Sequence, residues 1–133
     1  MYLTYDNTGK IVNYFQGPSF MWDVQPKDGG LFFIDVDDSM DITNMYVLSG
    51  NVMTRPTQAT LLDKATLIAN GIDVINITNA PDGIFTATNT STGESVSGSI
   101  SGNDTFLTTV KGTIKIKIEA FPYLDFTTTI EAI

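Results

Sequence analysis

The sequence contains neither histidine nor cysteine among its 133 residues. The lack of cysteine excludes disulfides, thiolate metal sites and thiol nucleophiles, and the lack of histidine removes the usual general base of nucleophilic triads. No serine precedes a lysine with the S-x-x-K spacing. Paired carboxylates for glycoside cleavage would be chemically feasible, but no feature of the sequence selects a pair. We therefore expect no enzyme activity and no cofactor.

Charged residues make up 17% of the chain, and none of them forms a segregated basic cluster. Lysine and arginine total 7 against 15 for aspartate and glutamate, which gives a net charge of −8. Because clustered basic side chains bind phosphate groups, we expect neither nucleic acid nor an anionic membrane as a partner. The sequence also lacks an apolar run of roughly 18 residues and the segments of a signal peptide, so we do not expect membrane insertion.

Residues 113–119 alternate polar and apolar side chains without interruption. A period of two places Ile114, Ile116 and Ile118 on one face of a strand and the charged side chains on the other. Short apolar segments separated by turn residues recur from residue 59 to residue 133. They predict strands over residues 59–62, 66–69, 72–77, 84–88, 95–100, 105–110, 113–121 and 126–133.

Glycine and proline steps separate these predicted strands. The predicted turns are Asn70-Gly71, Pro81-Asp82-Gly83, Thr92-Gly93, Gly102-Asn103 and Lys111-Gly112. Short strands at this spacing are typical of a small immunoglobulin-like antiparallel β-sandwich. A helix over residues 59–69 is the alternative for that segment, because its leucine, alanine and isoleucine side chains also fit the helical period.

The N-terminal part carries a separate set of strand signals. Asp6-Asn7-Thr8-Gly9 is a strong turn sequence between residues 2–5 and 10–15, which predicts a β-hairpin. A loop follows over residues 16–30, and further strands are predicted over residues 31–36, 44–48 and 52–54. Pro56 cannot donate a ladder hydrogen bond, so we expect a boundary there. The expected architecture is all-β, with a small N-terminal β-module over residues 1–56 and an immunoglobulin-like antiparallel β-sandwich over residues 57–133.

Asp35, Asp37, Asp38 and Asp41 form the densest group of charges. Hard cations such as Ca²⁺ bind several oxygen ligands, and clustered carboxylates could supply some of them. The EF-hand pattern is not met, because Met40 stands where that loop requires glycine. Two interpretations follow for these four residues, a cation site and a solvated loop that closes a strand.

Tyr14, Phe15, Phe20 and Trp22 gather aromatic side chains beside and within the predicted loop. Aromatic faces anchor protein interfaces and also stack on sugar rings, so these residues form the candidate binding site. A module of about 55 residues has little core of its own, and the same side chains could instead form its interior. A protein interface, a glycan site and a core are the three interpretations.

Residues 59–73 resemble the opening of bacterial and phage immunoglobulin-like domains, with an apolar strand, the step Ala69-Asn70-Gly71 and a strand that carries Asp73. Residues 115–123 and 127–129 resemble the last two strands of such domains. The hairpin, turn and proline break of residues 2–56 resemble those of short tailed-phage proteins. These resemblances imply a non-enzymatic structural component of a tailed-phage virion, as a capsid decoration, neck, or tail and fibre accessory protein.

The resemblance also implies partners and a location. The partners would be other virion proteins, in a homo-oligomer or symmetric assembly, with a host-surface glycan as a further candidate. The location would be the virion, after assembly in the host cytoplasm. Two alternatives from other classes are a tail-fibre assembly chaperone absent from the mature particle and a surface adhesion or carbohydrate-binding module.

Overall fold

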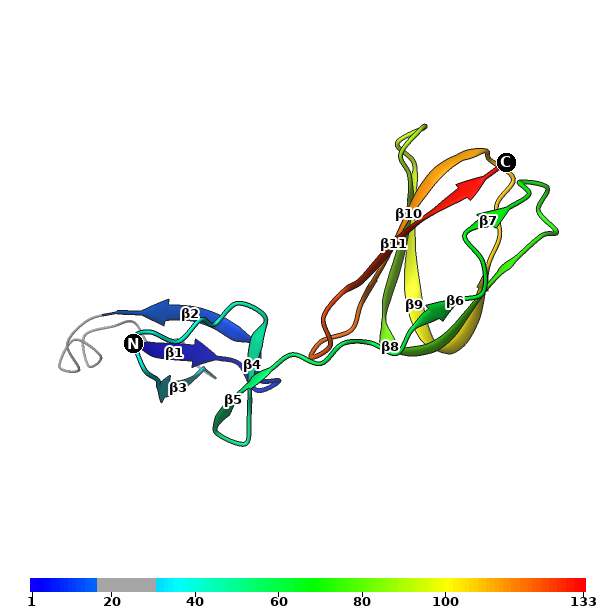
Figure 1. Cartoon of the computed structure of the whole chain (residues 1–133). Helices are drawn as coiled ribbons and strands as arrows, with labels where there is room; N and C mark the ends of the chain where they lie inside the picture. The colour runs from blue at the N-terminus through cyan, green and yellow to red at the C-terminus, as the bar shows by residue number, and fades with distance from the viewer. Residues whose placement is uncertain (17–30) are drawn as a thin grey trace. The chain divides into compact units, whose positions relative to one another are not determined.

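Every secondary-structure element that the structure describes is a β-strand (Figure 1). The computed structural model describes residues 1–16 and 31–133, and these residues contain no helix. They form two compact units, Met1–Arg55 and Pro56–Ile133, which we describe one at a time. The prediction of an all-β protein is confirmed. The helix alternative for residues 59–69 is wrong, because that segment holds the short strands β6 (Leu61–Leu62) and β7 (Thr66–Leu67).

The first unit contains a three-stranded antiparallel sheet. Its strands are β1 (Tyr2–Tyr5), β2 (Ile11–Phe15) and β3 (Phe32–Asp35), in the order β2-β1-β3. The central strand β1 buries Tyr2 and Leu3 almost completely, and successive side chains of a strand point to opposite faces. A hairpin of β4 (Met45–Leu48) and β5 (Asn51–Thr54) completes the described strands of this unit.

The turn between β1 and β2 follows from its sequence. The Asp6 carboxylate accepts hydrogen bonds from the Thr8 N–H at 2.9 Å, the Thr8 hydroxyl at 2.6 Å and the Lys10 N–H at 3.1 Å. Gly9 adopts φ +90°, and its carbonyl accepts the Val47 N–H at 2.8 Å. A side chain at residue 9 would overlap the Val47 carbonyl oxygen. Glycine is therefore required both by its backbone angle and by its close approach to β4.

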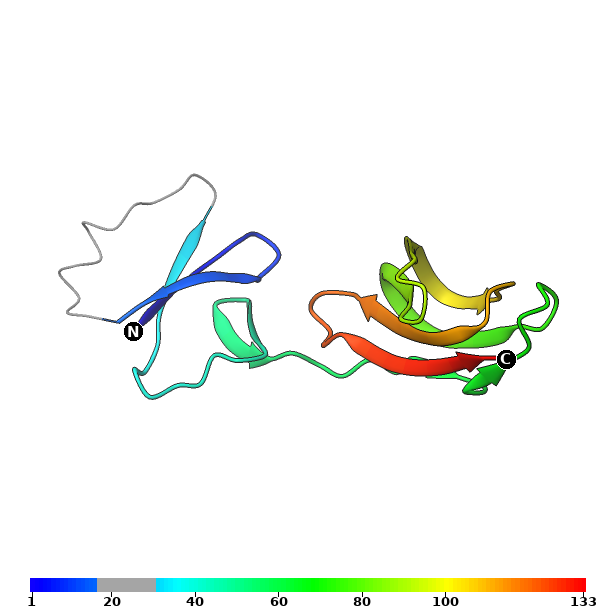
Figure 2. The ribbon, with the colours of Figure 1, turned by 90° about the horizontal axis from the view of Figure 1, so that it is seen from above.

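The second unit is a single hydrogen-bonded sheet of six strands. The long strands are β8 (Ile75–Asn89), β9 (Ser95–Phe106), β10 (Gly112–Glu119) and β11 (Phe126–Ala132). The order is β6-β8-β10-β11-β7, and β9 pairs with β8. All pairs are antiparallel except β11 with β7, and β10 and β11 lie side by side in Figure 2. Since one ladder system joins these strands, the immunoglobulin-like assignment stays a prediction.

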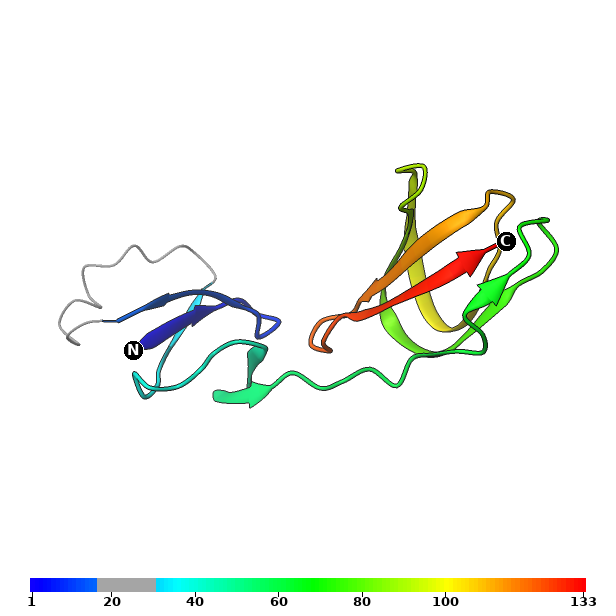
Figure 3. The ribbon, with the colours of Figure 1, turned by 45° about the horizontal axis from the view of Figure 1, so that its top comes forward.

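β8 and β9 are longer than the sequence predicts. β8 unites the strands predicted over residues 72–77 and 84–88, and β9 continues through Gly102, so the turns predicted at Pro81-Asp82-Gly83 and Gly102-Asn103 are wrong. The two strands absorb these residues as irregularities, because their register shifts between Ile77 and Ala80 and again between Ala80 and Gly83. Bulges of this kind bend a strand, and β8 and β9 curve together in Figure 3.

Gly83 has a packing role in the bent part of β8. A Cβ atom at this position would overlap the carbonyl oxygen of Glu119 and would lie 2.8 Å from the Cβ of Ala120. The backbone of β8 therefore approaches the end of β10 as closely as glycine alone permits. Glycine in a strand often marks such a close approach rather than a turn.

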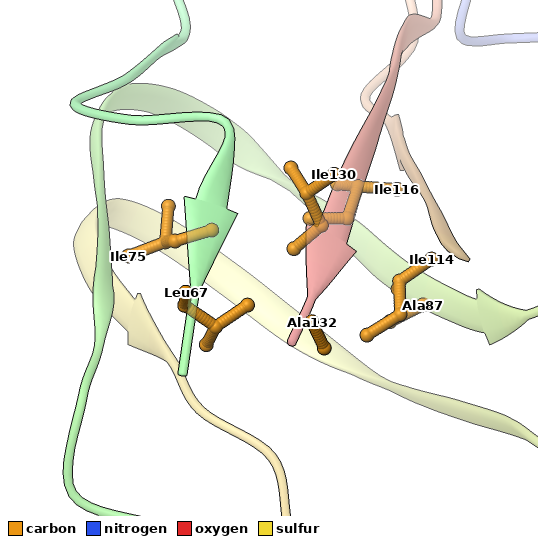
Figure 4. Close-up of a cluster of buried hydrophobic side chains, with 7 residues drawn as sticks. All are labelled: Leu67, Ile75, Ala87, Ile114, Ile116, Ile130 and Ala132. Atoms are coloured by element: carbon orange, nitrogen blue, oxygen red, sulfur yellow. The ribbon is translucent and has the colours of Figure 1, made fainter. Parts of the chain in front are cut away.

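The core of the second unit confirms the alternation predicted for residues 113–119. Ile114, Ile116 and Ile118 of β10 are buried, whereas Lys115 is exposed. The buried cluster shown in Figure 4 consists of Leu67, Ile75, Ala87, Ile114, Ile116, Ile130 and Ala132. A second cluster contains Ile77, Ala80, Ile100 and Ile118. One face of β10 thus contributes side chains to both clusters.

Candidate functional site

The aromatic candidates Tyr14 and Phe15 lie on opposite faces of β2. Tyr14 lies opposite Leu3 and keeps 58% of its surface exposed. The Phe15 ring packs inside the unit, with its centroid 5.6 Å from that of the Tyr2 ring. Phe20 and Trp22 lie outside the described residues. Tyr14 is therefore the described aromatic candidate that a partner could reach, while Phe15 contributes to the packing around β1.

β2 is an edge strand whose only ladder partner among the described strands is β1. Val12 lies two residues before Tyr14, at the register irregularity of the β1–β2 ladder between Thr4 and Tyr5, and exposes 55% of its surface. The Tyr14 N–H donates to the side-chain oxygen of Asn13 at 2.8 Å. We call Val12 and Tyr14 the β2 edge patch. An exposed apolar pair on an edge strand suits the addition of a partner strand.

Two of the four acidic candidates close turns with their carboxylates. Asp37 accepts hydrogen bonds from the Ser39 hydroxyl at 2.7 Å and the Ser39 N–H at 2.8 Å. Asp41 accepts the Thr43 N–H at 2.9 Å. These bonds favour the ionised form, so Ser39 lowers the pKa of the Asp37 carboxyl and Thr43 lowers the pKa of the Asp41 carboxyl. Both side chains behave as the solvated-loop interpretation expects.

The other two acidic candidates have different neighbours. Asp38 forms an ion pair with the N-terminal ammonium group of Met1, and Asp35 lies on β3 opposite Tyr2. Among residues 1–16 and 31–133, no three acidic side chains gather closely enough to hold a metal ion. The described residues therefore supply no ligand set for the cation interpretation.

The edge of β9 that faces away from β8, which we call its second edge, is a surface that no motif of the sequence marks. β9 pairs with β8, and no other strand in the described part of the chain pairs with it. Residues 95–101 contain no charged side chain, and Ile100 is buried in the core. Val96 lies opposite the buried Ala87, on the core side of the sheet, yet 62% of its surface is exposed. Lysine and proline usually protect an edge strand from pairing with another strand, and residues 95–101 contain neither. This lack was the signal in the sequence.

Two grooves of the second unit are lined mainly by apolar side chains. One, of about 140 Å³, has Ala87, Val96, Phe106, Leu107 and Val110 in its lining. The other, of about 300 Å³, lies between β6 and β11 and is lined by Thr60, Leu61, Leu62, Lys64, Ala65, Phe126, Thr128 and Ile130. Linings of this kind suit an apolar side chain of a protein partner.

Comparisons with known proteins add no family to this geometry. The described residues include no helix that is long and apolar enough to cross a membrane. Comparison of the chain with protein-family models, with curated proteins and with solved structures found no match. The resemblance to phage proteins noted in the sequence therefore stays a prediction.

Proposed function

We propose that the chain is a non-enzymatic structural component of a tailed-phage virion that acts through protein–protein contacts. In this proposal the first unit attaches the protein to other virion proteins, and the second unit decorates the particle. The observation that carries the proposal is the exposure of Val12 and Tyr14 on an edge strand. The resemblance of the sequence to short tailed-phage proteins supports the particle as the location.

The β2 edge patch supports attachment for energetic reasons. Full burial of one valine or aromatic side chain contributes roughly 1.5–3 kcal/mol, and tyrosine is a frequent anchor of interfaces. A partner strand beside β2 would add backbone hydrogen bonds to this apolar contact. The net charge of −8 disfavours a phosphate-rich partner, so the patch fits a protein better than a nucleic acid.

Two carboxylates of the second unit, those of Asp63 and Asp73, have structural roles. The Asp63 carboxylate accepts the Asn76 side-chain amide at 2.7 Å and its N–H at 2.8 Å. The Asp73 carboxylate accepts the Lys64 ammonium at 2.6 Å and the Ile68 N–H at 2.7 Å. These bonds, from Asn76 and from Lys64 first, lower the pKa of both carboxyls. A general acid needs the opposite shift, so these groups are suited to holding loops together.

The proposal is tested by the incorporation of variants into purified, washed particles of the phage that encodes the chain. Val12→Glu and Tyr14→Glu place a charge on the β2 edge patch and should reduce the copies per particle by about tenfold, which corresponds to about 1.4 kcal/mol of lost affinity. Ile72→Glu is the matched control, because Ile72 is 82% exposed and lies in the second unit. It should be incorporated like the wild type.

Two results would contradict the proposal in different ways. Wild-type incorporation of Tyr14→Glu, with circular dichroism showing a folded protein, would contradict attachment through β2. Absence of the wild-type protein from washed particles, together with abundance in the infected lysate, would contradict a virion role and favour a fibre-assembly chaperone.

A further inference from the structure

At its second edge, β9 directs a row of backbone hydrogen-bonding groups away from β8, in the plane of the sheet. The Asn89 N–H donates to the Glu94 carbonyl at 2.8 Å where the β8–β9 hairpin begins. Hydrogen-bonded and non-hydrogen-bonded pairs alternate along an antiparallel ladder, and the register from this point to Gly83 is unbroken. Val96, Gly98 and Ile100 therefore direct their backbone groups to β8. The residues that direct theirs to the second edge are Ser95, Ser97 and Ser99.

Side-chain contacts agree with this assignment. The hydroxyls of Thr88 and Ser95 lie 3.1 Å apart, and those of Thr86 and Ser97 lie 3.4 Å apart. Such close side chains are characteristic of non-hydrogen-bonded pairs, in which the Cα atoms approach most closely. Since no strand of residues 1–16 or 31–133 pairs with the second edge of β9, its serine backbone groups have no ladder partner there.

The sequence of this edge is symmetric about Gly98. Residues 95–101 read Ser-Val-Ser-Gly-Ser-Ile-Ser, with a β-branched apolar residue two positions on either side of the glycine. A twofold axis at Gly98 would place Val96 opposite the partner's Ile100 and Ser97 opposite the partner's Ser99. Interfaces of twofold symmetry require this kind of self-complementarity, because each residue meets its counterpart in reverse order.

We propose that β9 pairs with the β9 strand of a second copy of this chain, antiparallel about a twofold axis at Gly98. The serine backbone groups of both copies then complete a ladder, and the two sheets become continuous. The pairing also covers Val96, which is exposed in the single chain although it lies on the core side of the sheet. This inference goes beyond the proposed function and concerns the purified protein alone.

Charge and register favour this alignment over its neighbours. No charged residue lies within residues 95–101, and Glu94 falls opposite the partner's Gly102. The nearest registers that keep the serine backbone groups paired are shifted by two residues, and they would place Glu94 opposite either the partner's Ile100 or the partner's Asp104. The first shift sets a carboxylate against an apolar side chain, and the second sets two like charges against each other.

Gly98→Cys tests the position of the axis, because the chain has no other cysteine. A Cβ atom at residue 98 meets no atom within 4 Å, so the substitution fits the strand. In the proposed dimer the two residues form a non-hydrogen-bonded pair with Cα atoms about 4.5 Å apart, within disulfide range. Ser95→Cys is the control, since its two copies would lie roughly 20 Å apart. Mild oxidation should link Gly98→Cys almost completely and Ser95→Cys hardly at all.

Sedimentation equilibrium of the full chain tests the ladder itself. Ser99→Pro removes an N–H that points to the second edge and leaves the bonds to β8 intact, whereas Ser99→Thr keeps that N–H. The wild type and Ser99→Thr should dimerise, and the dissociation constant of Ser99→Pro should rise at least about tenfold. A wild type that stays monomeric at about 1 mM overturns the proposal, as does a folded Ser99→Pro that dimerises like the wild type. If Ser99→Pro fails to fold, the comparison of Gly98→Cys with Ser95→Cys is the test. Equal cross-linking of these two variants overturns the proposal.

Discussion

Alanine at position 83 should destabilise the second unit, whereas alanine at position 98 should stabilise it slightly. Both glycines lie in strands, and neither has a positive φ. At Gly83 the new methyl group would overlap the Glu119 carbonyl oxygen and lie 2.8 Å from the Ala120 Cβ, while at Gly98 it meets no atom within 4 Å. The comparison therefore isolates the close approach of β8 to the end of β10 from the general effect of replacing glycine.

The expected magnitudes come from two opposing contributions. Alanine in place of glycine restricts the unfolded chain and stabilises a compatible site by about 0.4–1 kcal/mol. A methyl group forced into a filled site costs about 1–3 kcal/mol. Gly83→Ala should therefore lower the free energy of unfolding by about 1–2 kcal/mol on balance. In a unit of this size each kcal/mol corresponds to about 4–8 °C in Tm, so Tm should fall by roughly 5–15 °C.

Differential scanning calorimetry of the full chain measures both variants, with urea denaturation as a second measure. A low protein concentration keeps β9 pairing between copies from contributing to the stability of Gly98→Ala. A Tm of Gly83→Ala at or above that of the wild type would refute the packing argument. Equal shifts in the two variants would refute it too, because the structure assigns a close neighbour to Gly83 alone of the two.

Two further predictions concern the core and a loop carboxylate. Ile116→Ala, at a fully buried position, should lower the free energy of unfolding by about 2–5 kcal/mol, whereas Lys115→Ala should change it by less than about 0.5 kcal/mol. Urea denaturation separates them, and similar losses would contradict the alternation of β10. The hydrogen bonds from the Lys64 ammonium and the Ile68 N–H lower the pKa of the Asp73 carboxyl from 3.8. The stabilisation that the Asp73 carboxylate provides is therefore present above its unfolded pKa and is lost as the pH falls through its folded pKa. Wild type and Asp73→Asn should therefore differ in Tm at neutral pH and converge near pH 2, and a difference that persists at pH 2 would argue against this contact.

Local patterns predicted the strands whose two faces differ in environment. Ile114, Ile116 and Ile118 face the core while Lys115 faces water, so a period of two is visible in the sequence. The turn after β1 was equally visible, because Asp6 bonds its own neighbours and needs no distant partner. Interactions within a few residues leave their signal in the local sequence.

Features that depend on distant residues were not visible in this way. Gly83 follows a proline and an aspartate and so has the sequence of a turn, but its role comes from the Glu119 carbonyl, which lies far away in the sequence. The open edge of β9 depends on which strands pair with β8, and no local pattern encodes that choice. Tyr14 and Phe15 look alike in composition, yet adjacent positions on a strand place one at the surface and the other beside Tyr2.

We propose that this chain is a structural part of a virus particle. The decisive experiment is absolute quantification by mass spectrometry of washed particles, with the major coat protein as internal reference. The proposal predicts a fixed copy number that survives washing and agrees between preparations. Removal of the protein by washing, or its absence from particles while the lysate contains it in abundance, would contradict the claim.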